Sequence, residues 1–194
     1  MSGRHFLRGC IALLLFLALP ASAAQVTLHI DTLDGPQFHA RNIRASWQGD
    51  TLSASVGELS VQGRTWRNVR LDCGAFQAGD TLQCKHGRIV LGRAIPFDFS
   101  YRQAAQRLEL VLFPGSGETW RLESQQCNAR WESRLTLARA EVSRLTPWWP
   151  AAWPVPTAGT LSGVLFWAGN ALPEHVSGAV EVRDLAFSDA AGLH

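Results

Sequence analysis

Side chains that could carry out chemistry are few in this sequence and far apart. Asp31 and Asp34 could act as the paired acid and base that glycosidases use, but a strand end rich in Asp, Thr and Gly explains them as well. Ser162 lies in Gly-Thr-Leu-Ser-Gly, which is not the Gly-x-Ser-x-Gly elbow of the hydrolases. No His-Glu-x-x-His, P-loop or Gly-x-Gly-x-x-Gly motif occurs. We therefore expect neither enzymatic activity nor a cofactor. The histidines are scattered singly at His29, His39, His86, His175 and His194.

Two cysteines flank a turn-rich stretch. A hairpin centred between Ala78 and Gly79 would place Cys73 opposite Cys84, with β-carbons about 4.5–5.5 Å apart. The closer cross-strand pairs approach disulfide spacing, so we expect a Cys73–Cys84 disulfide. Cys127 is then left over, either buried or free to pair with another chain. The competing reading is a metal site, but no Cys-x-x-Cys and no His at ligand spacing supports one.

The N-terminus has the three parts of a secretory signal peptide. Arg4 and Arg8 give a positive start, Ile11–Leu19 is an unbroken apolar run, and Ala21-Ser22-Ala23 is a small-residue cleavage site. The apolar run is too short to span a membrane, which takes roughly 20 residues. We expect residues 1–24 to be removed and the rest to be exported to the periplasm or cell envelope, where disulfides form.

The exported chain is electrically balanced. Loss of Arg4 and Arg8 from the 18 basic residues leaves 16, against 16 acidic residues. Nucleic-acid-binding proteins usually show a basic excess, so we expect no nucleic-acid partner. Residues 25–194 are enough for one domain with its own core.

Period-two alternation of apolar and polar residues dominates the chain. Leu108, Leu110 and Leu112 share one face, and Glu109 points to the other. Turn signals at short spacing separate such runs, which predicts an all-β antiparallel meander forming a twisted, curved sheet or open β-groove. The apolar faces could form a closed core or line an open groove, and the pattern does not separate the two. Other alternating runs are Val26-Leu28-Ile30, Phe97-Phe99-Tyr101, Trp131-Ser133-Leu135-Leu137 and Val176-Gly178-Val180-Val182.

The pattern breaks once, over residues 139–156. We expect a short helical turn near 139–146, built on Leu137, Val142 and Leu145 and ended by Pro147. Three tryptophans follow among four prolines. They form either a rigid aromatic plug at one end of the sheet or a docking patch for a lipid interface or partner. These candidate interface aromatics are Trp148, Trp149 and Trp153.

Residues 135–192 carry a recognisable series of motifs. After a strand and an x-L-x-x-W-P segment come G-x-L-S-G-x-L, a Gly-Asn turn and V-x-G-x-V-x-V-x-x-L-x-F-S-D-x-x-G. This series resembles the repeats of the AsmA/TamB-like superfamily of bacterial envelope proteins, including its branch labelled "dicarboxylate transport". The residues before 135 match the family only in the spacing of their expected strands. Family members are commonly longer and usually keep an N-terminal membrane helix, whereas this chain starts with a short cleavable segment.

The resemblance implies a long, strongly twisted sheet whose apolar inside guides phospholipid between membranes, with no catalytic residues. Leu108, Leu110, Leu112, Leu135 and Leu137 are candidate lipid-facing residues from their strand stripes. The resemblance adds Leu161, Leu165, Val180, Val182, Leu185 and Phe187 by position.

The sequence stops soon after its last expected strand. A sheet ending there would leave an edge strand uncovered, so we expect either the N-terminal part of a longer protein or pairing with another subunit. The first functional hypothesis is therefore an envelope β-groove protein that binds or conducts lipid. The second is an accessory protein of envelope assembly or secretion that pairs through its sheet edge. The N-type accessory subunit of type II secretion is similar in its strand-rich style. An exported hydrolase is the third.

Overall fold

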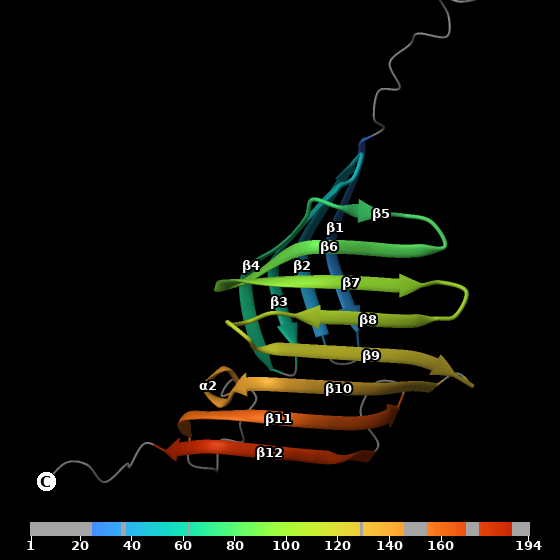
Figure 1. Cartoon of the computed structure of the whole chain (residues 1–194). Helices are drawn as coiled ribbons and strands as arrows, with labels where there is room; N and C mark the ends of the chain where they lie inside the picture. The colour runs from blue at the N-terminus through green and yellow to red at the C-terminus, as the bar shows by residue number, and fades with distance from the viewer. Residues whose placement is uncertain are drawn as a thin grey trace, which may run out of the picture.

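The computed structural model describes residues 25–35, 38–61, 63–128, 130–145, 155–169 and 175–187, so the expected signal segment 1–24 lies outside it. The described chain is almost entirely β-strand (Figure 1). Its elements are β1 (Gln25–Gly35), β2 (Phe38–Gln48), β3 (Thr51–Val61), β4 (Arg64–Cys73), β5 (Phe76–Gln77), β6 (Thr81–Leu91), β7 (Arg93–Arg102), β8 (Arg107–Leu112), β9 (Thr119–Cys127), β10 (Arg130–Glu141), α2 (Val142–Leu145), β11 (Pro156–Gly169) and β12 (His175–Phe187).

The strands form one open antiparallel meander. The sheet has 12 strands in the order β1-β2-β3-β4-β6-β7-β8-β9-β10-β11-β12, and the two-residue β5 pairs only with β6. Every strand pairs with the next along this order, as short turns between alternating runs require. The predicted fold class, an all-β curved sheet with one short helical turn, is confirmed.

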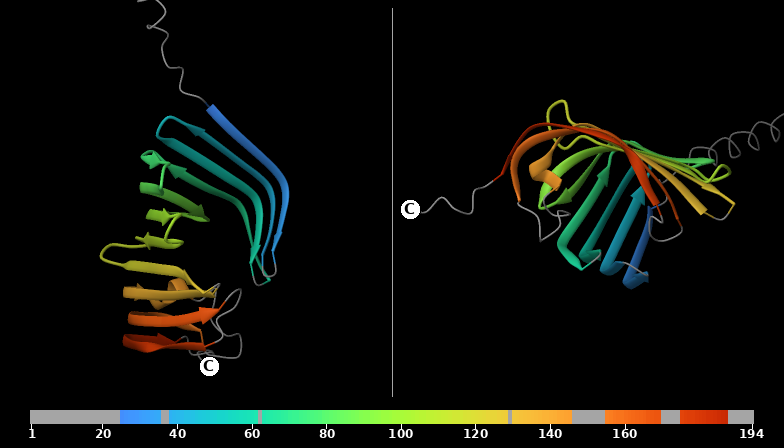
Figure 2. Two further views of the ribbon diagram at one scale, coloured as in Figure 1. Left: turned by 90° about the vertical axis from the view of Figure 1, so that its right-hand side faces the viewer. Right: turned by 90° about the horizontal axis from the view of Figure 1, so that it is seen from below.

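The sheet bends into two leaves. Strands β1–β4 form one leaf and β6–β12 the other, and Figure 2 shows the first leaf folded over the second. Only Arg70–Asp72 of β4 pair with β6, opposite Arg88–Val90. Residues 64–69 of β4 have no partner on β6, and at the other end of the contact a Cys73–Cys84 disulfide with a Cα–Cα distance of 5.9 Å joins the two leaves.

The predicted disulfide is confirmed, although its geometric basis was wrong. The expected hairpin placed Cys73 directly opposite Cys84. In the structure Phe76 of β5 occupies that position, and Gln77 pairs with Gln83. Cys73 ends β4 and reaches Cys84 from the neighbouring strand. The disulfide therefore joins the last residue of β4 to β6 instead of closing a simple hairpin.

Five residues within strands have a left-handed backbone and bend the sheet. They are Asn42 (φ 53°), Asn68 (φ 55°), His86 (φ 56°), Arg139 (φ 53°) and Asp184 (φ 53°), on β2, β4, β6, β10 and β12. The register does not shift at Asn42 and Asn68. At His86, Arg139 and Asp184 it shifts by one residue, and bulges of this kind kink a strand and increase its twist. They also reset the side-chain alternation, so that apolar residues on both sides of each bulge reach the same face of the sheet.

The bulge in β6 provides a test of this account. Lys85 and His86 both lie opposite Asp98, whose carboxylate accepts the His86 backbone N–H at 2.8 Å. We expect His86→Gly to keep this bond and leave stability within about 1 kcal/mol, because glycine adopts positive φ freely. His86→Val should cost about 1–2 kcal/mol. Urea denaturation measures both, and Lys85→Val is the control, expected within about 0.5 kcal/mol. Equal losses for the two valine variants would contradict a special backbone at His86.

The helical turn is shorter than the sequence indicated. Helix α2 covers only Val142–Leu145, and residues 139–141, which we placed in the helical turn, belong to β10. Arg139 lies in a bulge, and β10 continues beyond it to Glu141. The strand therefore extends past the point where the regular apolar alternation of the sequence ends. Val142 is 1% exposed and anchors the turn against β10 and β11. None of the helices in the described ranges is long and apolar enough to cross a membrane.

Candidate apolar trough

The concave face of the sheet carries continuous cross-strand rows of apolar side chains. Because opposed residues on neighbouring strands point to the same face, the register identifies the members of each row. One row joins Val26, Trp47, Leu52 and Cys73, and a second joins Leu28, Ala45, Ala54 and Leu71. We call this concave surface the trough. The other face of the sheet carries mainly polar side chains, and we call it the convex face.

The second leaf continues the trough through the predicted lining residues. The register places the following on one face: Leu108, Leu110 and Leu112 of β8, Leu135 and Leu137 of β10, Leu161 and Leu165 of β11, and Val180 and Val182 of β12. Leu110, for example, lies between Phe99 of β7 and Leu122 of β9, and Leu122 lies opposite Leu135. The strands thus bring together residues that the sequence spaces widely.

The last two predicted residues reach the trough because of a bulge. Arg183 still pairs with Thr160, but Ala186 pairs with Ala158, so β12 has one extra residue there. Leu185 consequently lies against Gly159, with its Cδ1 3.3 Å from where a β-carbon on that glycine would be. Phe187 lies opposite Pro156, which is buried.

A deep pocket lies where the two leaves meet. Its volume is about 360 Å³, and apolar side chains alone line it. Cys84 and Phe97 line it and are at most 4% exposed, and Cys73 belongs to the same buried cluster. The lining residues include Leu52 and Leu71 from the first leaf and Ile95, Leu110 and Leu112 from the second. We call it the junction pocket. Sequence analysis missed it because only the junction of β4 with β6 brings these strands together.

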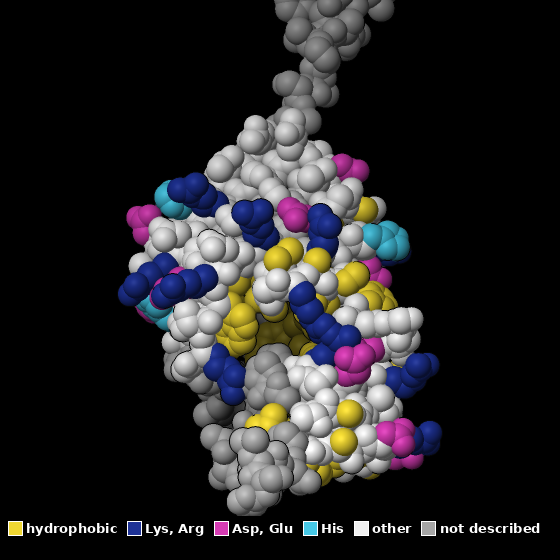
Figure 3. Space-filling view, turned by 90° about the vertical axis from the view of Figure 1, so that its left-hand side faces the viewer, with side chains coloured by type: hydrophobic (Ala, Val, Ile, Leu, Met, Phe, Trp, Pro, Cys, Tyr) yellow, Lys and Arg dark blue, Asp and Glu magenta, His cyan; other side chains and the backbone are white. Residues whose placement is uncertain are grey.

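Much of the trough is accessible to solvent. In the described ranges the buried apolar residues are few: Ala40, Val69, Cys73, Cys84, Phe97, Leu137, Ala140, Val142 and Pro156. Toward the two sheet edges the trough residues are open: Val26 is 54% exposed, Leu28 51%, Val176 59% and Phe187 47%. Figure 3 shows apolar side chains lining a hollow with basic side chains on its rim. The apolar faces therefore do not close on each other as a sandwich core would.

One buried carboxylate fastens α2 beside the trough. Glu118 is 3% exposed, and its Oε1 accepts the Trp120 indole N–H and the Glu141 backbone N–H, each at 3.0 Å. Arg144 Nε lies 2.8 Å from Glu118 Oε2, and Arg144 Nη2 lies 3.0 Å from a Glu141 carboxylate oxygen. Burial raises the pKa of Glu118, although the two hydrogen bonds act in the opposite direction. Sequence analysis missed this cluster because its members are not periodic.

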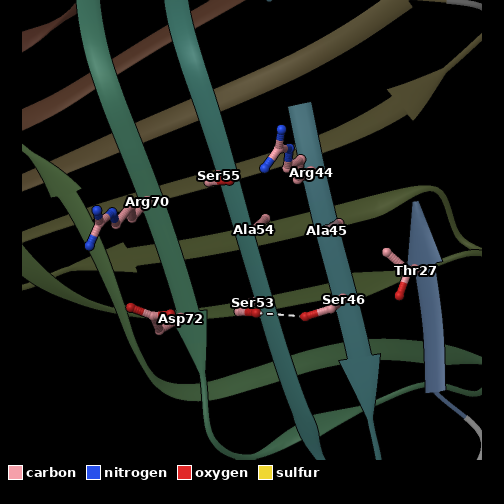
Figure 4. Close-up of a pocket in the computed structure, with 9 residues that line it drawn as sticks. All are labelled: Thr27, Arg44, Ala45, Ser46, Ser53, Ala54, Ser55, Arg70 and Asp72. Atoms are coloured by element: carbon pink, nitrogen blue, oxygen red, sulfur yellow. Dashed lines mark hydrogen bonds between the residues drawn. The ribbon is translucent and has the colours of Figure 1, made fainter. Parts of the chain in front are cut away.

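The convex face carries shallow polar depressions. The one drawn in Figure 4 has a volume of about 380 Å³ and lies over β1–β4. Its Ser46 and Ser53 hydroxyls hydrogen-bond to each other at 2.8 Å, and Arg44, Arg70 and Asp72 surround them. The Ser46–Ser53 bond is a cross-strand polar contact of the kind found on a solvent-facing sheet surface. The apolar trough is therefore the stronger candidate for a binding site.

The acidic residues considered for catalysis lie on exposed strand positions. The side chain of Asp31 is 89% exposed and that of Asp34 is 69% exposed. Asp34 contacts His39 Nδ1, and the register puts Ser60 opposite His39 on the next strand. The Ser60 hydroxyl bonds instead to Thr65 at 2.8 Å. No hydrogen bond joins His39 to Ser60 within the described strands, so an activated serine is not assembled in this row.

Other predicted residues have structural surroundings or lie outside the described ranges. The Ser162 hydroxyl accepts the Arg139 backbone N–H at 2.9 Å, which caps the β10 bulge. Cys127 is a free, half-buried cysteine. The described residues contain no group of three or more His, Cys, Asp or Glu that could hold a metal ion. Trp148, Trp149 and Trp153 fall outside the described ranges.

Comparison with known proteins gives no match: no family model, no curated protein and no solved structure is similar to this chain. The resemblance to AsmA/TamB-like repeats therefore stays a prediction. What the trough can do has to be argued from its own chemistry.

Proposed function

We propose that this chain is a non-enzymatic envelope β-groove protein that binds or conducts lipid along its trough. One observation carries the proposal: an apolar face that spans both leaves and stays open, with Val26, Leu28, Val180 and Phe187 all more than 40% exposed. Soluble proteins rarely leave a contiguous apolar surface uncovered unless it binds something. The resemblance of residues 135–192 to lipid-guiding repeats agrees with this use.

The binding mechanism is a transfer of acyl chain from water to the trough. Each buried CH₂ contributes about 0.8 kcal/mol. The junction pocket, lined by Leu52, Leu110 and neighbouring apolar side chains, encloses the chain most completely. The polar part of the lipid stays at the open rim in water, because burying it without partners would be costly. The sequence contains no P-loop motif, so the proposal includes no energy source, and another component would set the direction of any transport.

The proposed location is the periplasm or cell envelope. The Cys73–Cys84 disulfide fits an oxidising compartment. The signal-peptide pattern of residues 1–24 supplies the route.

A second candidate function is supported by the edge of the sheet. Strand β12 has no partner on its outer side among the described strands. Its Val176, Val180 and Val182 are 42–59% exposed, and proteins normally cover such edges. We propose as the alternative that an envelope-assembly or secretion partner adds a strand here.

Substitutions on one strand test the lipid proposal. Leu110 faces the junction pocket, whereas Val111 of the same strand pairs with Asp98 on the convex face. We expect Leu110→Asp to weaken binding of phospholipid by at least roughly tenfold, because the carboxylate must lose water when the acyl chain enters. Val111→Asp should bind like the wild type. Titration with a fluorescent phospholipid measures both, and circular dichroism checks the fold.

If Leu110→Asp does not fold, Leu110→Ala provides the same comparison with a smaller expected loss. Equal affinity of the Leu110 and Val111 variants would exclude the trough as the binding site. Purified wild-type protein that carries and binds no lipid, but retains a protein partner lost on charging β12, would favour the second candidate.

A further inference from the structure

We propose that the junction pocket selects amphiphiles with one acyl chain and an anionic head group, and that Arg93 holds the head group at the rim. This inference rests on the proposed lipid-binding function. It adds a class of ligand and the side chain that would recognise it.

The register places Arg93 on the trough face at the edge of the pocket. Ile89 and Ile95 are opposed and both line the trough, and the next pair on that face is Leu91 with Arg93. Leu91 and Ile95 are themselves pocket-lining residues. Gly92, with φ of 80°, makes the tight turn between β6 and β7, so this pair ends the apolar row at the rim. The guanidinium of Arg93 therefore lies where the apolar row would otherwise continue.

The charge of Arg93 is available to a ligand. Arg93 is exposed and forms no ion pair or hydrogen bond with the other described residues. The positive charge of Arg93 acts on the Glu118 carboxyl and lowers its pKa. That carboxylate already has a closer cation in Arg144, at 2.8 Å, so it does not neutralise Arg93. The basic side chains around the hollow in Figure 3 fit a rim that attracts anions.

The size of the pocket argues for one chain. Its volume of about 360 Å³ is near the lower end of the roughly 300–1,000 Å³ found for ligand sites. A guanidinium at the end of an apolar cavity matches a carboxylate or phosphate at the end of a single acyl chain, since it can bind either with two parallel hydrogen bonds. An uncharged head group would gain no such pairing.

Three detergents with the same tail isolate the effect of the head group. We expect isothermal titration of the exported chain, below micelle-forming concentrations, to give tightest binding for dodecyl phosphate. Dodecyl maltoside, whose head group is uncharged, should bind about three- to tenfold more weakly, the range expected for one partly exposed ion pair. Dodecylphosphocholine, whose phosphate charge is offset by its own ammonium group, should bind with intermediate affinity. Arg93→Gln should remove the difference. The control is Arg102→Gln, which removes the same charge from the far end of β7.

Each outcome supports or overturns a distinct statement. Loss of the anionic preference in Arg93→Gln, but not in Arg102→Gln, supports the assignment, and added salt should reduce the preference. Inorganic phosphate that binds or competes as well as dodecyl phosphate would show a free-anion site and overturn it. Equal binding of all three detergents, unchanged in Arg93→Gln, would overturn the selection by Arg93 and leave the lipid-binding trough intact. Failure of all three to bind would count against the trough itself.

Discussion

Replacing Arg144 with alanine is expected to destabilise the protein by about 3–5 kcal/mol. The variant leaves the Glu118 carboxylate, 3% exposed, without its cation, and an uncompensated buried charge carries a penalty of this size. The loss should shrink as the pH falls. Burial holds the folded-state pKa of Glu118 above its unfolded value, so as the pH falls the folded protein takes up a proton before the unfolded chain does, and the unpaired charge is removed. Denaturant titrations at several pH values measure both effects.

An exposed ion pair provides the control for this prediction. Arg107 lies 3.3 Å from Glu123, with side-chain exposures of 48% and 27%, so Arg107→Ala should cost at most about 1 kcal/mol. Adding Glu118→Gln to Arg144→Ala should recover much of the lost stability, because the amide oxygen can still accept the hydrogen bonds from Trp120 and Glu141. A large loss that persists in the double variant would mean that Arg144 acts through packing alone.

Removing the disulfide is expected to have the second largest effect. The bond closes a loop with a sequence separation of 11, which corresponds to about 2–3 kcal/mol of loop entropy. It also joins the two leaves where β4 has stopped pairing with β6. We therefore expect the Cys73→Ala/Cys84→Ala variant to unfold at lower denaturant concentration, and exposure of the wild type to a reductant to reproduce the shift.

Cys127 supplies the matched control. It is a free, half-buried cysteine on β9, so Cys127→Ala should change stability by less than about 1 kcal/mol and leave the sensitivity to reductant unchanged. A wild type whose unfolding midpoint does not move in reductant would show that the Cys73–Cys84 bond contributes nothing to stability.

Local alternation was sufficient to predict the class of fold and the face shared by apolar residues within one strand, whereas the trough residues on β11 and β12 were assigned from the resemblance. Leu108, Leu110 and Leu112 needed only a period of two to be assigned to one face. The sequence could not show whether that face was covered, because the same stripe fits a sandwich core and an open sheet. Whether the face is covered depends on how the two leaves are placed, and their placement depends on the short pairing of β4 with β6.

The left-handed residues within strands were missed although four of the five have a common signal. In each, a basic residue and then an Asn, His or Asp stand between two residues of the trough face. Asn, Asp and His are the residues other than glycine that adopt a left-handed backbone most readily. The signal was overlooked because two adjacent polar residues look like the end of a strand. The segments are Ala40-Arg41-Asn42-Ile43, Trp66-Arg67-Asn68-Val69, Cys84-Lys85-His86-Gly87 and Val182-Arg183-Asp184-Leu185.

The antiparallel order has a consequence for how copies of this sheet could be joined. Strand direction alternates at every step of the order, so the outermost strands β1 and β12 run the same way. A translated copy, with its β1 beside the first copy's β12, would need a parallel ladder, at odds with all other pairings. A copy rotated about a two-fold axis brings β12 against β12 in antiparallel fashion. Joining by translation is thus disfavoured, and a rotated pair joined through β12 would have two troughs that run in opposite directions.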